Sequence, residues 1–96
     1  MSLRRAQCKH LRRLGCALKP VVLIGAGGLS ESVLAELDNA LAHHELIKVR
    51  VRVGDRGRRD EVLAQLVTRS GATLVQRIGN VALLYRAAEE PKIHLP

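Results

Sequence analysis

Residues 21–33 run Val21-Val22-Leu23-Ile24-Gly25-Ala26-Gly27-Gly28-Leu29-Ser30-Glu31-Ser32-Val33, a pattern that predicts a buried strand, a glycine loop and a helix. The four apolar residues suit a short strand covered on both faces, and Ser30 is a good N-cap. Such a loop turns backbone N–H groups toward an anion, and its glycines let a ligand come close. The loop is the first candidate binding site. Its members are Gly25, Ala26, Gly27 and Gly28.

The chain carries a formal net charge of +7, and this charge is unevenly distributed. Residues 1–28 hold six basic residues and no acid, whereas residues 29–46 hold four acids and no Lys or Arg. Residues 47–59 hold six basic residues and one acid, and residues 60–96 hold four basic residues and four acids. Positive potential concentrated on particular elements favours a nucleic-acid phosphate as the bound anion.

Length and composition predict one globular domain over residues 1–96 with an aliphatic core, because the chain has one Tyr and no Phe or Trp. RNA recognition by base stacking would have little aromatic surface, so phosphates and shape should dominate. No apolar run approaches eighteen residues, and the basic N-terminus lacks an apolar region. We therefore expect neither a membrane span nor a signal peptide, and a cytoplasmic location.

The two cysteines, Cys8 and Cys16, lie about two turns apart in or beside a helical segment. This is too far for an easy disulfide across one helix. A metal site with His10 would have a spacing that matches no common zinc module. We expect two reduced thiols, no metal and no other cofactor.

The first helix is predicted from an N-cap at Ser2 to about Leu14, with Gly15 as the stop residue. At 100° per residue its apolar residues fall on one side and its cations on the other. A charged face is ordinary for a surface helix, but the lack of acids through residue 28 favours a nucleic-acid contact. The candidate cations of this segment are Arg5, Lys9, Arg12, Arg13 and, after the helix, Lys19.

The second helix is predicted from Ser30 to about Ala42 and should bury its apolar stripe, which consists of Val33, Leu34, Leu37, Ala40 and Leu41. Its acids Glu31, Asp38 and Glu45 should be exposed and repel nucleic acid, which leaves only the helix N-terminus suited to a phosphate. His43 and His44 lie at the other end, where helix capping is the favoured role; a catalytic or metal-binding pair is the alternative.

Residues 46–53 alternate strictly between apolar and basic, which predicts a half-buried strand with Ile47, Val49, Val51 and Val53 inward. The outward cations, about 6.6 Å apart, approach the phosphate spacing of a nucleic-acid strand. A solvated edge strand would look the same. Three arginines in the following turn extend the patch and favour binding. The candidate cations are Lys48, Arg50, Arg52, Arg56, Arg58 and Arg59.

The remaining elements are a helix over about 58–70 that ends at Gly71, strands over 73–78 and 81–86 joined by Gly79-Asn80, and a tail over 87–96 that lies on the surface. The order α-β-α-β-α-β-β predicts a two-layer α/β fold with a mixed four-stranded sheet. The early strand pairing should be parallel and the last antiparallel. Helices should lie mainly on one face, leaving the outward side of strand 46–53 to solvent.

Several segments together resemble the CRM domain (chloroplast RNA splicing and ribosome maturation). These segments are Leu18–Ser30, His43–Val49, Gly71-Ala72 and Ile78-Gly79, and the ending Lys92-Ile93-His94-Leu95-Pro96 resembles the stand-alone bacterial members of the YhbY type. The resemblance implies an RNA-binding fold similar to the C-terminal domain of translation initiation factor three, and association with precursors of the large ribosomal subunit. It also implies that residues 25–28 form a GxxG loop comparable to that of KH domains. Ala26 brings no cation to this loop, so flanking helices should supply the charge.

Two other function classes are weaker. A nucleotide-using enzyme would need the Walker lysine or full GxGxxG spacing, and neither is present; Ser, His and acids form no recognisable catalytic group. A basic architectural protein that coats duplex DNA is the main alternative. We expect a non-enzymatic, monomeric protein that binds RNA, with ribosomal RNA of large-subunit precursors as its partner.

Overall fold

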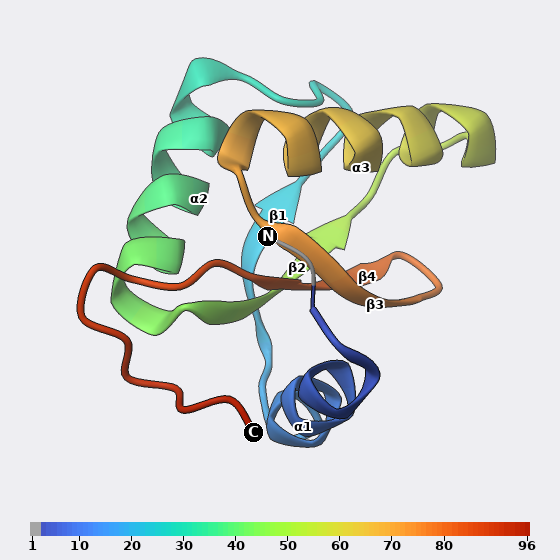
Figure 1. The fold of residues 1–96 in the computed structure, drawn as a ribbon. Coiled ribbons are helices and arrows are strands. Elements are labelled where there is room, and N and C mark those ends of the chain that lie inside the picture. The colour runs from blue at the N-terminus through green and yellow to red at the C-terminus, as the bar shows by residue number, and fades with distance from the viewer. Residues whose placement is uncertain (1–2) are drawn as a thin grey trace.

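The computed structural model describes residues 3–96 and contains three helices and four strands there (Figure 1). The predicted order α-β-α-β-α-β-β is confirmed. Strand ends differ by one or two residues from the prediction, at Val51 and Tyr85. The elements are α1 (Arg5–Gly15), β1 (Pro20–Ile24), α2 (Glu31–His44), β2 (Leu46–Val51), α3 (Arg56–Ser70), β3 (Thr73–Ile78) and β4 (Val81–Tyr85).

The four strands form one mixed sheet in the order β1-β2-β4-β3. β1 pairs with β2 in parallel, and both pairs that involve β4 are antiparallel, as the sequence predicts. Gly79 closes the β3–β4 hairpin with φ +59°, a conformation that glycine adopts without a steric penalty. The end of β1, the end of β2 and this hairpin therefore lie at the same end of the sheet.

Helices α2 and α3 cover one face of the sheet and form the larger core. Leu37 and Leu41, from the predicted apolar stripe of α2, are buried together with Val62, Leu63 and Leu66 of α3. The helix N-terminus at Ser30 is also as predicted, because its hydroxyl accepts a hydrogen bond from the Val33 N–H at 3.2 Å. The strand side chains in this core are Val22, Ile24, Ile47, Val49, Val51, Ala82 and Leu84.

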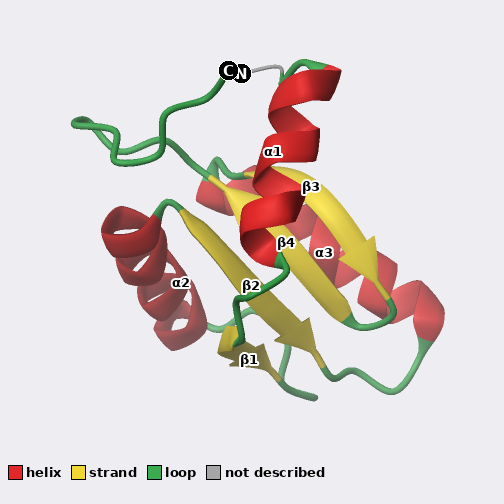
Figure 2. Ribbon diagram, turned by 90° about the horizontal axis from the view of Figure 1, so that it is seen from below, coloured by secondary structure: helices red, strands yellow, loops and turns green. Residues whose placement is uncertain are grey.

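Helix α1 packs on the opposite face (Figures 1 and 2). Its Leu11 joins Leu46, Leu83 and Tyr85 in a second buried cluster. Gly15 is the last helical residue, and a Cβ there would lie 2.7 Å from a Leu83 methyl, so the glycine permits close packing of α1 on β4. Two of the three helices thus share one face, but the other face, expected to be open, is partly covered.

The starts of α1 and α3 differ from the prediction. Ser2 lies outside the described residues, and α1 begins after Arg4, whose N–H donates to Gln7 Oε1 at 2.9 Å. Helix α3 begins at Arg56, about two residues early, because the Asp55 carboxylate accepts from the Arg58 N–H at 3.3 Å and caps it. The three arginines predicted in a turn therefore occupy the first turn of α3.

Part of the α1 face stays open. Leu23, Arg50, Val81 and Ile78 are paired in one row across all four strands. Leu23 is 54% exposed and Ile78 is 68% exposed. The outward orientation predicted for Arg50 is confirmed, but it lies among apolar side chains that the sequence did not assign to a surface.

Glu45 corrects the prediction for the acids of the second helix, because its side chain is completely buried. The residue turns the chain from α2 into β2 with φ +61°. Its carboxylate accepts three backbone hydrogen bonds from the C-terminal tail, which Ala88 donates at 2.9 Å, Lys92 at 2.6 Å and Ile93 at 3.0 Å. A single side chain therefore holds a segment that lies more than forty residues away in sequence.

The tail is fixed more firmly than a segment that only lies on the surface. Ile93 and Leu95 pack against the α1 cluster, and the Pro96 carbonyl accepts from Gln7 Nε2 at 3.3 Å. Figure 2 shows the resulting course of the tail beside α1. Both the hydrogen bonds to the Glu45 carboxylate and the packing on the α1 cluster therefore hold the C-terminal tail.

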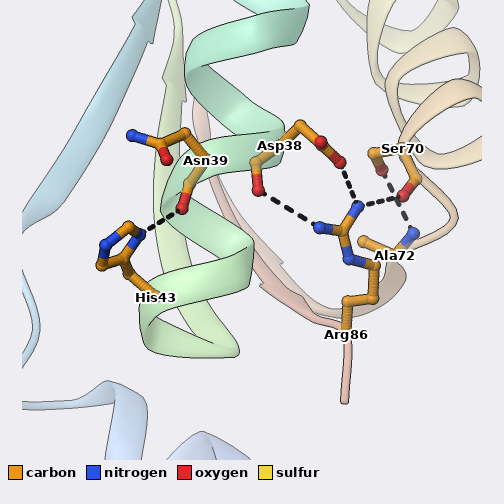
Figure 3. Close-up of polar contacts among 6 residues, drawn as sticks. All are labelled: Asp38, Asn39, His43, Ser70, Ala72 and Arg86. Atoms are coloured by element: carbon orange, nitrogen blue, oxygen red, sulfur yellow. Dashed lines mark hydrogen bonds and ion pairs between the residues drawn. The ribbon is translucent and has the colours of Figure 1, made fainter. Parts of the chain in front are cut away.

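Arg86, just after β4, joins the middle of α2 and the end of α3 to the sheet (Figure 3). Its guanidinium contacts the Asp38 carboxylate at 2.6 Å and donates to the Ser70 carbonyl at 2.9 Å. In the same region His43 Nδ1 lies 3.0 Å from the Asn39 carbonyl oxygen, a local contact in the last turns of α2.

The pKa of Glu45 reflects its surroundings. Burial raises it, but the N–H groups of Ala88, Lys92 and Ile93 and the charge of Lys92 outweigh burial and hold it below its ordinary value of 4.5. A depressed folded-state pKa contributes stability that is present above the unfolded pKa and is lost as pH falls through the folded value.

We predict that Glu45→Gln lowers the free energy of unfolding at pH 7 by about 1–3 kcal/mol, because a carboxamide cannot accept all three hydrogen bonds. Thermal unfolding between pH 2.5 and 7 measures this. The difference from the native chain should shrink below about pH 4.5. The exposed α2 acid Glu36, changed to Gln, is the matched control. An equal loss at every pH would contradict the assigned role of the charge.

Candidate nucleic-acid interface

The glycine loop joins β1 to α2 at one end of the sheet (Figure 1). The Gly28 N–H donates to the Gly25 carbonyl at 3.0 Å, which closes a turn. Gly28 is buried and has φ +71°, so its glycine identity has a structural reason.

Gly27 differs from Gly28. It is exposed, its φ is not in the left-handed region, and an added Cβ would meet no atom within 4 Å. Gly25 is equally free of steric contacts, and Ala26 is exposed between them. The packing of the described chain therefore does not require a glycine at 25 or 27.

One arginine side chain borders this loop, and the backbone of a second arginine reaches its start. A Cβ on Gly28 would lie 3.4 Å from Nη2 of Arg58, in the first turn of α3. The Arg52 N–H donates to the Ile24 carbonyl at 2.7 Å, which brings the chain after β2 to the loop. The acid Glu31 lies in the first turn of α2, and Arg69 offsets its charge at 3.3 Å. The contact between Arg58 and the loop could not be predicted from the sequence, because it joins residues thirty positions apart.

The cations of α1 form a separate group. Arg5, Lys9 and Arg13 are exposed and Arg12 is half-buried. Helix α1 and the glycine loop lie on opposite sides of the sheet in Figure 1. The predicted basic helix face is therefore present, but the structure does not bring it to the loop.

The cations of β2 point to the α1 face, whereas α3 packs on the other face. Lys48 is half-buried and lines a groove with Lys19 beside the end of α1, and Arg50 is exposed in the open row of the sheet. The six cations expected to form one patch are thus divided. Lys48 and Arg50 belong to the α1 side. The exposed Arg52, just after β2, and the arginines of α3 belong to the loop end.

Ion pairing separates the candidate cations from other basic residues. The ion pairs among residues 3–96 are Arg69–Glu31, Arg77–Asp60 and Arg86–Asp38. None of the cations proposed from the sequence takes part in them. These cations are therefore available to an external anion at no cost in broken ion pairs.

Other kinds of site have less support. The part of the chain that the structure describes holds no group of three or more His, Cys, Asp or Glu that could bind a metal. Cys8 and Cys16 are free, with Cys16 exposed. No helix within residues 3–96 is long and apolar enough to cross a membrane.

The observed features define a small α/β domain with an exposed glycine loop and a basic surface. Residues 3–86 match the family model of the CRS1 / YhbY (CRM) domain, and the chain belongs to this family. The resemblance found in the sequence is thereby confirmed.

Relatives cover almost the whole chain. A Haemophilus influenzae protein named RNA-binding protein is 48% identical over 90 residues, which are 94% of this chain and 91% of that protein. A Pseudomonas aeruginosa protein, named as a probable RNA-binding protein, is 43% identical over 99% of this chain and 91% of its own. The solution structure of a Staphylococcus aureus protein superimposes with a TM-score of 0.82 at 33% identity, covering 99% of this chain and all of that one.

The two loop glycines should respond differently to alanine. We predict that Gly28→Ala lowers the melting temperature by about 4–15 °C, since a left-handed non-glycine residue costs about 1–2 kcal/mol. Gly27→Ala should leave it unchanged or slightly higher, because its backbone suits alanine. Thermal unfolding by circular dichroism measures both. A loss at Gly27 equal to that at Gly28 would mean that the loop glycines serve the fold alone.

Proposed function

We propose that this protein binds structured RNA, with the glycine loop and the first turn of α3 holding the phosphate backbone. The observation that carries the proposal is that Gly27, in the loop that Arg58 borders, is exposed and not sterically constrained by its own chain. Membership of the CRM family and the names of the relatives support RNA as the ligand.

The loop supplies backbone N–H groups, and the arginines supply charge. A phosphate seated at Gly27 would meet no side chain of the loop larger than the Ala26 methyl. Arg58 can then donate charge-assisted hydrogen bonds to its oxygens. Because no aromatic side chain is available for base stacking at this end of the sheet, binding depends on backbone shape and charge.

The cations of the α1 side provide a second contact. A folded RNA presents phosphates in several directions, so one RNA helix can meet the loop while another meets α1, Lys19, Lys48 and Arg50. Ribosomal RNA in precursors of the large subunit has this character, and it is the partner that the family resemblance implies. We propose assistance to ribosome assembly, without catalysis, by a monomer in the cytoplasm.

Competition at equilibrium tests the ligand class. A fluorescent hairpin RNA from the large-subunit ribosomal RNA is bound, and unlabelled duplex DNA of equal length or unlabelled RNA is added. We expect RNA to compete at much lower concentration than DNA. Equal competition would favour the architectural DNA-binding alternative, and a nucleotide hydrolysis assay on the same preparation tests the enzyme alternative.

We predict a steep salt dependence of RNA affinity. Each phosphate contact contributes a log–log slope of about −0.7 to −0.9, so several contacts should give about −3 to −6 in total. Fluorescence anisotropy between 50 and 300 mM KCl measures the slope. Changing Arg5, Lys9 and Arg13 together to Gln should make the slope shallower without lowering the melting temperature, because these three side chains are exposed. A slope near zero would refute the electrostatic basis of binding.

The loop is tested by Gly27→Asp. The aspartate places a negative charge where we expect a phosphate, and affinity should fall by about 1–3 kcal/mol, the range of a lost charge-assisted contact. The melting temperature should stay near that of the native chain, since Gly27 is exposed and has room for a side chain.

Ala42→Asp is the charge-matched control for this variant. Ala42 is exposed and lies at the opposite end of α2 from the loop, so it adds the same charge away from the expected phosphate. RNA affinity that is equal in the two variants would show that the loop is only a turn and that the cations elsewhere do the binding.

A further inference from the structure

A polar pocket lies between the first turn of α3 and the β3–β4 hairpin. Its volume is about 410 Å³. Three guanidinium groups and one carboxylate line it, together with the backbone of the hairpin turn. These residues are Arg56, Arg59, Asp60, Arg77 and Gly79.

One of these guanidiniums has an unused donor. The Nε of Arg59 is buried and has no hydrogen-bond partner within residues 3–96. A buried donor without an acceptor is costly, and most such groups in folded proteins do have a partner. An oxygen atom bound in the pocket would supply the missing acceptor.

The charge of the pocket favours an anionic ligand. Asp60 Oδ1 lies 2.6 Å from Arg77 Nη1, and Arg77 Nε donates to the Gly79 carbonyl at 3.4 Å. Asp60 offsets one of the three positive charges, so two remain. Guanidiniums present several donors in a planar fork that matches phosphate oxygens.

The pocket and the glycine loop face the same end of the sheet. Arg77 is paired with Ala82, whose side chain lies in the core under α2 and α3, so Arg77 is on the α3 side. β1 and β3 are the two edges of the four-stranded sheet. Three interstrand steps separate these two edges by about 14 Å. The first turn of α3 lies between, with Arg58 beside the loop and Arg59 in the pocket.

We infer that this pocket is a second phosphate site, in which Arg59, Arg77 and Arg56 hold one internal phosphodiester of the same RNA strand. The inference rests on the proposed RNA binding and adds Arg77 and Asp60 to it. Asp60 holds Arg77 in place while the pocket is empty and competes with the phosphate for that guanidinium. RNA must therefore replace one ion pair of Arg77 with another.

Opposite charge changes give opposite results in this arrangement. Arg77→Gln should weaken RNA binding by about fivefold or more, and Asp60→Asn should strengthen it by about two- to fivefold, since the competitor of the phosphate is removed. Were Arg77–Asp60 only a surface ion pair that joins the hairpin to α3, both variants would leave affinity unchanged and lower stability equally. Anisotropy titrations measure affinity, and thermal unfolding verifies folding.

Matched controls neutralise the same charges elsewhere. Lys92→Gln removes one positive charge and Glu90→Gln one negative charge, both on the exposed tail. We expect Lys92→Gln to change RNA affinity less than Arg77→Gln does, and Glu90→Gln to change it less than Asp60→Asn does. RNA with a 5′-phosphate and RNA with a 5′-hydroxyl should bind equally, because the pocket takes an internal phosphate; preference for the 5′-phosphate would overturn that assignment.

Nuclear magnetic resonance gives a direct readout. The Arg59 Nε–Hε signal should shift on addition of the hairpin RNA, and the shift should be lost in Arg77→Gln. If Gly27→Asp weakens binding but Arg77→Gln and Asp60→Asn do not change it, the pocket is refuted and the proposed function stands. If the native chain binds no RNA while inorganic pyrophosphate shifts the Arg59 signal, the pocket holds a free anion, and the inference fails with the proposed function.

Discussion

The parallel pairing of β1 with β2 is the constraint on which the candidate site depends. It places the end of β1, and with it the glycine loop, beside the point where the chain leaves β2, as the bond from the Arg52 N–H to the Ile24 carbonyl records. The chain after β2 must then turn back over the sheet, so the first turn of α3 begins near the loop. Asp55 fixes that start by capping the helix, which orients Arg58 toward Gly28.

A second constraint, the Glu45 carboxylate, acts away from the candidate site. It turns the chain between α2 and β2 and accepts three hydrogen bonds from the tail, and the tail then packs on the α1 cluster. The segment His43–Val49 that carries part of the family resemblance therefore contains a structural residue beside cations such as Lys48. This motif therefore combines a structural residue, Glu45, with a candidate binding residue, Lys48. The two roles can be told apart only from the contacts that each side chain makes.

Local patterns predicted the elements well, because strand alternation, N-caps and hairpin glycines act within a few residues. The loop, Ser30 and the turn at Gly79 were visible in this way. Contacts over long sequence separation were not. The burial of Glu45 depends on residues 88–93, and the placement of α1 depends on Gly15 fitting Leu83. For the same reason, the sequence assigned Arg56–Arg59 to the patch of Lys48, although they lie on opposite sides of the sheet.

The distribution of acids divides the arginines of this basic chain into two groups, those in ion pairs that hold the fold and those left for binding. Glu31, Asp38 and Asp60 pair with Arg69, Arg86 and Arg77. Glu45 is occupied by backbone N–H groups, and Asp55 caps α3. These five acids therefore already have partners within the protein. The arginines in the first turn of α3 form no ion pair within residues 3–96. Because mutual repulsion of unpaired cations costs stability, an exposed basic cluster of this kind favours any ligand that brings negative charge to it.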